Sequence, residues 1–240
     1  MPISFRRSVT AGTRLLVPAL LLCLFSLTAA QAIGQETTTQ YPGLMKQLDR
    51  IDFAISAEGN LSKTVSGIEQ RDAPTTHSLL TIKPSSGVGE LFALRYTAKP
   101  YVGFELNVSN SRGTQDYTFV PPPAQNLLFG GAQAAVREMT LGYVAHIQYH
   151  PLGITPYLGA GGGTIRFKPT AGGGQGLPEQ YRAVYYYTAG LEDNFPDSHF
   201  GMRVGFRQLI YLAPDFLQNY LTITRRTTTT EPTVGFFVRF

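Results

Sequence analysis

The feature that most constrains this chain is a two-residue alternation of apolar with other side chains, which begins at Ile51 and recurs to Phe240. In the segment EPTVGFFVRF (231–240), every second residue counted back from Phe240 is apolar, and the positions between them include a charge and a glycine. Alternation of this period is typical of strands with two different faces, and no later stretch shows a convincing helical period. The sequence therefore predicts an all-β fold.

Eight alternating segments can be delimited, and the connections between them are in turn long and short. This order predicts an antiparallel up-and-down barrel in which both ends of the chain lie on the side of the short turns. Each segment provides about the 9 to 11 residues that a tilted membrane-spanning strand needs. The segments are 51–61, 79–96 (interrupted by a bulge at Pro84), 101–110, 137–149, 155–167, 181–192, 199–211 and 225–240. The connection between the third and fourth segments, SRGTQDYTFVPPPAQNLLFGGAQ (111–133), is expected to be a long loop.

The first 32 residues have the pattern of a secretory signal peptide. A basic start with Arg6, Arg7 and Arg14 precedes the apolar run LLVPALLLCLF, and Ala30-Gln31-Ala32 supplies small residues for cleavage after Ala32. We therefore expect a signal peptide over 1–32, a short periplasmic leader over 33–50 and a barrel domain over 51–240.

Removal of this segment changes the chemistry of the chain. Cys23, the single cysteine, lies within it, so the mature chain has no thiol and no disulfide. Three of the 20 Lys and Arg residues, but none of the 16 acidic ones, also lie there, so the mature chain is nearly neutral. Nucleic acid is therefore a poor candidate partner.

Alternation alone does not say which face of the strands meets solvent, since a soluble lipocalin-like barrel also alternates, with its apolar face inward. Here the less apolar face is rich in glycine and in charges of both signs, which suits the narrow interior of an eight-stranded barrel. We therefore predict an inverted barrel with apolar side chains toward lipid. The predicted interior ion network comprises Arg95, Glu105, Glu138, His146, Arg166, Glu192, Arg203, Arg207 and Arg239.

The segments RYTAKPYVGFELNVSNSRGTQDY, PYLGAGGGTIRF and EPTVGFFVRF resemble those of the OmpA/OmpX-type eight-stranded outer-membrane barrels of Gram-negative bacteria. The resemblance covers 51–240 and implies an outer-membrane location. It also implies that the last strand is a signal for the barrel assembly machinery and closes against the first strand. That signal strand would comprise Val234, Gly235, Phe236, Val238 and Phe240.

Few residues suggest catalysis or metal binding. The glycine-rich stretches GAGGGTIRF and TAGGGQG do not continue into the lysine and helix of a phosphate-binding loop, so we interpret them as barrel wall and flexible loop. The four histidines, His77, His146, His150 and His199, have no metal-ligand spacing. Catalytic residues, metals and cofactors are therefore not predicted.

The predicted function is that of a non-enzymatic, monomeric outer-membrane barrel acting through its outer loops in envelope integrity, adhesion or surface contact. Arg225 and Arg226 are candidates for contact with lipopolysaccharide phosphates. Two alternatives stay open. One is a narrow channel for small or apolar solutes. The other is a lipid A-modifying barrel enzyme that uses the pair His77-Ser78 near the outer rim.

Overall fold

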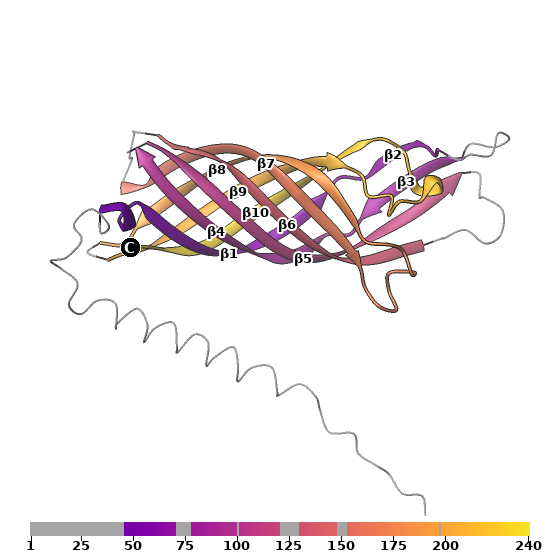
Figure 1. Cartoon of the computed structure of the whole chain (residues 1–240), viewed down its shortest axis with the longest axis horizontal. Coiled ribbons are helices and arrows are strands. Elements are labelled where there is room, and N and C mark those ends of the chain that lie inside the picture. Colours follow the sequence, from indigo (N-terminus) through magenta and orange to yellow (C-terminus); the bar gives the residue numbers. More distant parts are fainter. Residues whose placement is uncertain (1–45, 71–77, 100, 121–129, 148–152, 197) are drawn as a thin grey trace, which may run out of the picture. The chain divides into compact units, whose positions relative to one another are not determined.

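The computed structural model describes residues 46–70, 78–99, 101–120, 130–147, 153–196 and 198–240, and these form an antiparallel barrel (Figure 1). The strand order is β2-β3-β5-β4-β1-β10-β9-β8-β7-β6, and the pairing of β5 with β6 closes the sheet. The predicted signal peptide and most of the predicted leader lie outside the described residues. The strands are β1 (Ile51–Ser62), β2 (Val65–Ile68), β3 (Leu79–Pro84), β4 (Gly87–Lys99), β5 (Val102–Val120), β6 (Gly130–His146), β7 (Thr155–Pro169), β8 (Gln180–Asn194), β9 (Phe200–Leu212) and β10 (Arg226–Arg239).

Two of the barrel strands are interrupted, so the ten strand segments of the described residues make an eight-stranded wall. Both β3 and β4 pair with β5, with a break at Ser85 and Ser86 directly after Pro84. The neighbouring break, between β1 and β2, lies beside it, because Asn60 faces Gly87 below the two breaks. The predicted eight-stranded antiparallel up-and-down barrel is confirmed, including the irregularity at Pro84.

Long and short connections alternate as predicted. The short connections follow β4, β6 and β8, and the C-terminal ends of these strands lie at the end of the barrel that also holds the C-terminus, which we call the short-turn end (Figure 1). The opposite, long-loop end carries β2, β3 and the 3-10 turn η2 (Asn219–Leu221). The predicted long loop over 111–133 is wrong for most of its length, because β5 continues to Val120 and β6 begins at Gly130.

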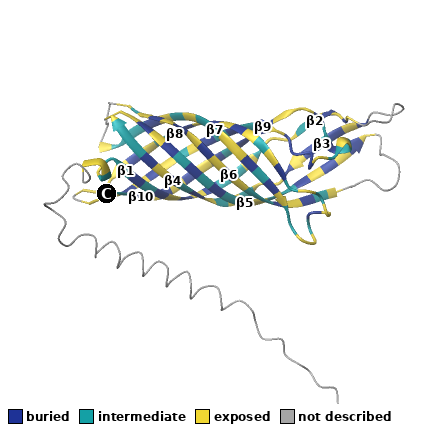
Figure 2. Ribbon diagram, in the orientation of Figure 1, coloured by how far each residue is buried: buried dark blue, intermediate teal, exposed yellow. Residues whose placement is uncertain are grey.

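The polarity of the wall reverses along the strands. In the half toward the short-turn end, exposed and buried residues alternate along the strands (Figure 2). The exposed, outward residues of this half are apolar, and we call this zone the apolar belt. On β5 its outward residues end at Val108, and Asn110, Arg112 and Thr114 follow on the same face. The larger belt residues are Ile55, Leu94, Phe104, Met139, Leu141, Tyr143, Leu158, Tyr185, Tyr187, Leu191, Met202, Val204, Phe206, Val234 and Phe236.

The glycines of β7 make room for an aromatic ring inside the narrow barrel. Gly159, Gly161 and Gly163 share the inward face of β7 with the buried Tyr157. A Cβ at Gly161 would lie 2.8 Å from a ring carbon of Tyr186, which is inside van der Waals contact. The glycines are therefore needed because larger side chains would not fit inside the wall at this point, as the sequence suggested.

The last strand closes the barrel against the first. β10 pairs with β1 in antiparallel register, with Phe236 opposite Ile55 and Val238 opposite Phe53. Val234, Phe236 and Phe240 are exposed on the outward face, Val238 is half-buried, and Gly235 lies on the inward face. The predicted alternation and closure are confirmed, whereas recognition by an assembly machinery stays a prediction.

Candidate functional site: the interior and outer rim of the barrel

Six ionisable side chains form a proximal cluster inside the barrel near the short-turn end. The guanidinium of Arg95, which is fully buried, donates from Nε to Oε2 of Glu105 at 2.9 Å and pairs through Nη1 with Glu192. Arg203 donates from Nε to Oε1 of Glu192 at 2.8 Å and from Nη2 to Oδ1 of Asp52 at 3.0 Å. The cluster comprises Asp52, Arg95, Glu105, His146, Glu192 and Arg203, and the ring of Tyr157 lies 5.0 Å from the Arg95 guanidinium carbon. Each buried charge thus has an opposite charge in contact.

A second, middle cluster contains more acids than bases. Arg207 pairs through Nη2 with Glu138 and through Nη1 with Glu231, the latter at 3.1 Å. Glu58 lies on the same inward side and is 2% exposed, but no basic residue of the described chain forms an ion pair with it. Three carboxyl groups, those of Glu58, Glu138 and Glu231, therefore share one guanidinium.

The structure brings together Arg95, Glu105, His146, Glu192 and Arg203 in one group and Glu138 with Arg207 in another. Sequence reasoning left Asp52, Glu58 and Glu231 out of the network. Their positions carried the signal, because Asp52 and Glu58 alternate with apolar residues of β1, and Glu231 shares the inward parity of Gly235.

Two arginines of the predicted network lie elsewhere. Arg166 is on the outward face of β7, where its Nη2 donates to Oε2 of Glu179 at 2.6 Å, so its assignment to the interior is wrong. The inward residues beside it are Ile165 and Phe167, since the interior is apolar at this height. Arg239 has the inward parity of β10 but lies at the mouth of the short-turn end, stacked 5.6 Å from the ring of Phe237.

The interior of the outer half is apolar. The outer apolar core packs against Val65, Val136, Leu177 and Tyr220, and its rings of Phe167 and Phe216 meet edge to face at 6.5 Å between centroids. Between this core and the middle cluster lies a cavity of about 30 Å³. This is about the volume that one molecule occupies in liquid water. The core comprises Leu80, Ile82, Tyr117, Phe119, Ala132, Ala134, Ile165, Phe167, Val184, Tyr186, Leu209, Tyr211, Ala213, Phe216, Leu221 and Ile223.

The loop between β9 and β10 (213–225, the capping loop) supplies the top of this core. Phe216 and Leu221 are fully buried in it, although Phe216 and Leu217 have φ angles of 48° and 59°, a region that costs energy for such residues. Oε1 of Gln180 accepts from the amides of Asp215 and Phe216 at 3.1 and 3.0 Å and so fixes the strained turn.

The carboxylate of Asp215 fastens the capping loop to β8. Burial alone would raise the pKa of Asp215, but hydrogen bonds from Gln180, the Leu217 amide and Thr222, and the charge of Arg182, outweigh it and lower the pKa below its usual value. Its Oδ2 lies 2.7 Å from Nη2 of Arg182. The loop is therefore held by a group that is ionised at neutral pH.

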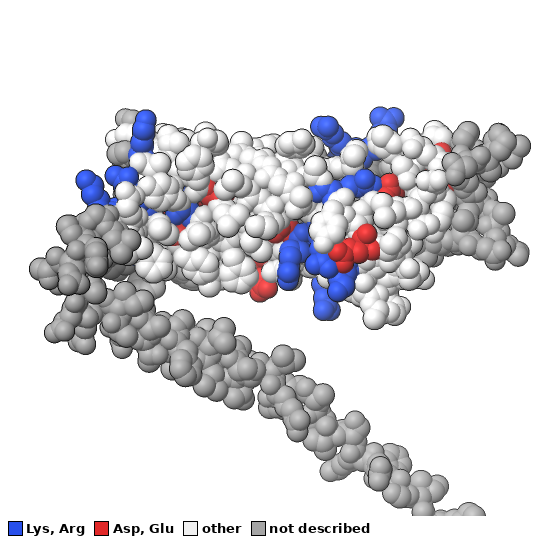
Figure 3. All heavy atoms as spheres, in the orientation of Figure 1, with Lys and Arg blue, Asp and Glu red and all other residues white. Residues whose placement is uncertain are grey.

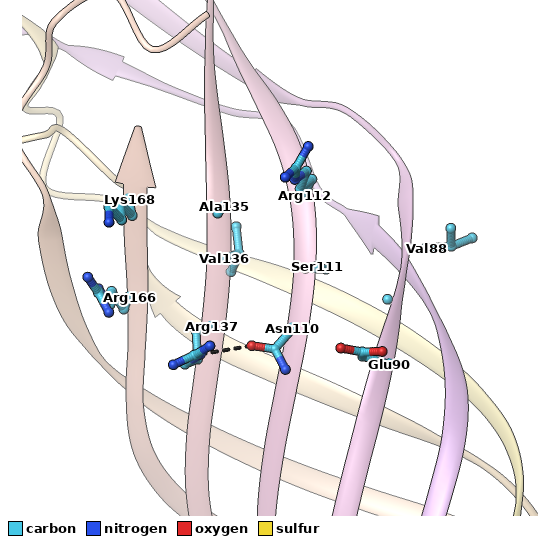
Figure 4. A pocket seen from close by; sticks show the side chains of 11 residues that line it. Val88, Glu90, Asn110, Ser111, Arg112, Ala135, Val136, Arg137, Arg166 and Lys168 are labelled. Atoms are coloured by element: carbon cyan, nitrogen blue, oxygen red, sulfur yellow. Dashed lines mark hydrogen bonds between the residues drawn. The ribbon is translucent and has the colours of Figure 1, made fainter. Parts of the chain in front are cut away.

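A hollow of about 720 Å³ lies on the outside of the wall, across β4 to β7, immediately beyond the apolar belt (Figure 4). Four basic side chains line it, Arg112, Arg137, Arg166 and Lys168, together with one acidic side chain, Glu90. Figure 3 shows basic atoms gathered on the face in view beyond a band in which charged atoms are sparse. We call these four residues the basic row.

The other residues singled out from the sequence lie apart from these groups. Arg225 and Arg226 are exposed at the long-loop end, where β10 begins. His199 is exposed beside β9 at the short-turn end, whereas His77 and His150 lie outside the described residues. Over the described ranges, no group of three or more His, Cys, Asp or Glu side chains has a metal-binding arrangement.

The described part of the chain contains no helix with the length and apolar character of a membrane span.

No protein-family model matches this sequence, and a search of curated proteins found no match. Solved structures with a similar arrangement include Neisserial surface protein A (13% identity, TM-score 0.46, 78% of this chain and 97% of that chain). Ail, the attachment invasion locus protein of Yersinia pestis, is 17% identical with a TM-score of 0.37, over 79% of this chain and 98% of that one. The outer membrane protein AlkL is 14% identical with a TM-score of 0.39, over 78% and 90%.

Proposed function

We propose that this protein is a non-enzymatic, non-conducting outer-membrane barrel that displays the outer half of its wall as a rigid surface for contact outside the cell. The observation that carries the proposal is the reversal of polarity along single strands, as from Val108 to Asn110 on β5. Only lipid makes an exposed apolar wall favourable, and a closed barrel is one of the two structures that can cross it. The half beyond the belt has the opposite pattern, which suits water.

The filling of the interior supports a role other than transport. A solute would have to pass the ion pairs of Arg95 and Arg207 and then the core capped by Phe216, and the space between them is that of one water molecule. Breaking a buried ion pair costs about 3–5 kcal/mol, and this cost favours an interior that stays closed.

The long-loop end offers apolar side chains to a partner. Ile68, Leu79 and Val120 are register neighbours on β2, β3 and β5, and they are exposed by 56%, 42% and 61%. A row of this kind is suited to contact with another macromolecule. We infer surface contact rather than catalysis. Of the pair His77-Ser78 that the enzyme would use, Ser78 is buried, with 2% of its surface exposed, and His77 lies outside the described residues.

Single cysteines test the topology, because the mature chain is expected to contain none. On intact Gram-negative cells, a membrane-impermeant maleimide is expected to label Thr118→Cys, which is outward on β5 beyond the belt. The matched variant Leu141→Cys in the belt and Asp193→Cys near the short-turn end should stay unlabelled until the cells are lysed in detergent. Labelling of Asp193→Cys on intact cells would reverse the orientation and contradict the proposal.

Planar bilayers test the absence of conduction. The wild-type barrel should give no single-channel steps, and the double variant Phe216→Ala/Arg207→Ala should give steps, because it loosens the apolar cap and the middle cluster together. Steps of uniform size from the wild-type protein would instead support the narrow channel. Chemically altered lipid A in cells that express the wild-type protein would support the enzyme.

A further inference from the structure

The four basic side chains of the basic row are placed where the apolar belt ends. Arg137 follows Met139 on the outward face of β6, and Asn110 follows Val108 on β5, so each is the first polar residue past the belt. Register pairs join Glu90 to Asn110, Asn110 to Arg137 and Arg137 to Arg166 across four strands. In the next row outward, Arg112 pairs with Ala135 and Ala135 with Lys168. The small side chain of Ala135 leaves the hollow open between the two cations (Figure 4).

The cations of the basic row repel one another, and the acidic side chains of the described residues neutralise them only in part. Arg137 and Arg166 are direct register partners, and like charges directly opposite each other on neighbouring strands are destabilising. Arg166 is neutralised by Glu179 at 2.6 Å, whereas Arg137 contacts a neutral group, with Nε donating to Oδ1 of Asn110 at 2.8 Å. Within the described residues, the side chain of Arg112 has no hydrogen bond or ion pair. A multiply charged anion seated among these cations would relieve the repulsion.

We propose that the hollow lined by the basic row binds the phosphate groups of a phosphorylated lipid of the outer leaflet, with lipopolysaccharide as the occupant. The acyl chains of such a lipid would lie along the apolar belt below, and its phosphates would reach Arg112, Arg137 and Lys168 at the belt edge. Arginine forms paired hydrogen bonds with phosphate oxygens, which gives such a site geometric selectivity. The proposal depends on the belt facing lipid and not on what the interior does.

The same geometry argues against the pair that the sequence singled out. Arg226 is eight residues beyond Val234, the last apolar belt residue of β10. At about 3.3 Å per residue, this places it about 26 Å along the strand from the belt edge. On β6, Arg137 is two residues past Met139, and on β5, Arg112 is four residues past Val108. The basic row is therefore the better match for phosphates at the lipid surface.

The experiment compares two double variants that each remove two cations from the outer half. The mature barrel is refolded in detergent micelles with increasing lipopolysaccharide, and its unfolding midpoint is followed by heat-dependent gel mobility. Lipopolysaccharide should raise the wild-type midpoint, and Arg137→Ser/Lys168→Ser should need on the order of tenfold more lipid for half of that rise. The matched control Arg225→Ser/Arg226→Ser should need the same amount as wild type. Equal losses in both variants, or no loss in the first, would overturn the proposal.

Two further measurements are needed. One distinguishes lipid phosphate from free phosphate, and the other distinguishes lipid binding from an effect of the substitutions on stability alone. Lipopolysaccharide stripped of its phosphates, and inorganic phosphate at equal concentration, should both leave the wild-type midpoint unchanged. The same rise with inorganic phosphate would overturn the assignment to lipid. Without lipid, Arg137→Ser/Lys168→Ser should unfold at the same or a higher temperature, because the repulsion with Arg166 is gone. If this variant does not refold, Arg112→Ser, which removes no intramolecular bond, is measured in its place and should show the same weakened response; an unchanged response overturns the proposal.

Discussion

The two halves of the barrel are built from the same strands but follow opposite rules. Near the short-turn end, Met139 and Leu141 of β6 face outward and Glu138 faces inward; farther along the same strand, Gln133 faces outward and Ala134 inward. One half thus has charges inside and apolar groups outside, and the other resembles a soluble barrel. The comparison teaches that one continuous strand can pass between lipid and water without a change in its backbone pairing. Only the side chains change, at the point where the surroundings change.

The two halves also differ in how their interiors are held together. The interior near the short-turn end depends on ion pairs, and the loss of one charge leaves its partner buried without a counterion. The outer apolar core depends on apolar packing, which tolerates exchange among side chains of similar volume. The four predictions below break or sharpen this contrast, beginning with the largest expected effect.

The first prediction places methionine in each interior. Arg95→Met should lower the free energy of unfolding by about 3–5 kcal/mol, because Glu105 and Glu192 would be left as buried charges with one counterion fewer. Phe167→Met in the outer apolar core should cost less than about 1.5 kcal/mol. Urea unfolding of the barrel in vesicles measures both. Equal costs would show that the two interiors do not differ in kind.

The second prediction places arginine on each outer face of one strand. Leu141→Arg, in the belt of β6, should cost about 2–4 kcal/mol, since the charge enters hydrocarbon. Gln133→Arg, outward on the same strand beyond the belt, should change the free energy of unfolding by less than about 0.5 kcal/mol. The measurement is the same urea titration in vesicles. A cost at Gln133 that equals the cost at Leu141 would place the lipid boundary elsewhere.

The third prediction concerns the excess acid of the middle cluster. Glu58→Gln should raise the free energy of unfolding by about 1 kcal/mol, because it removes a buried carboxyl group without an ion-pair partner. The matched variant Glu138→Gln should lower it, because Glu138 pairs with Arg207. A loss of stability in both variants would show that Glu58 has a partner.

The fourth prediction concerns the pH at which the capping loop is held. The chain has no tryptophan, so Leu217→Trp, at a position 69% exposed in the loop, gives a single fluorescence signal. The pKa of the Asp215 carboxyl is lowered in the folded protein, so its contribution to holding the loop is present above its ordinary value near 3.8 and is lost as the pH falls through the lower folded value. Emission should therefore be constant at neutral pH and change only below pH 3.8. A change between pH 5 and 7 would contradict this, and Asp215→Asn should abolish the acid transition.

Much of the fold follows from the sequence, because strand alternation is local and survives in every segment. This alternation predicts the inward orientation that the structure has for Glu105, Glu138, Glu192, Arg203 and Arg207. The error at Arg166 arose from applying one rule, charges inward, over the whole length of a strand whose surroundings change. Ile165 and Phe167 on the other face carried the opposite signal.

The remaining features depend on contacts between segments far apart in the sequence. Nothing local to Phe216 or Leu221 indicates that the capping loop folds back into the barrel, since their burial depends on Gln180 of another strand. The basic row is equally non-local, because Arg112, Arg137 and Lys168 come from three strands and only the register brings them together. Such sites require the pairing of strands to be known.

The adjacent breaks in the wall have a consequence for how the outer half can vary in length. Below them Asn60 faces Gly87, and above them Val65 faces Ile82. The residues between do not pair with one another across the breaks; they pair with the flanking strands, Ser62 with Thr229 of β10 and Pro84 with Gln115 of β5. A pair of residues inserted or deleted at Lys63 and at Ser85 would shift β2 and β3 along their neighbours β10 and β5 by an even number of residues, so every belt residue would keep its face. The breaks thus allow the half of the wall at the long-loop end to change in length while the half that carries the apolar belt keeps its strand register.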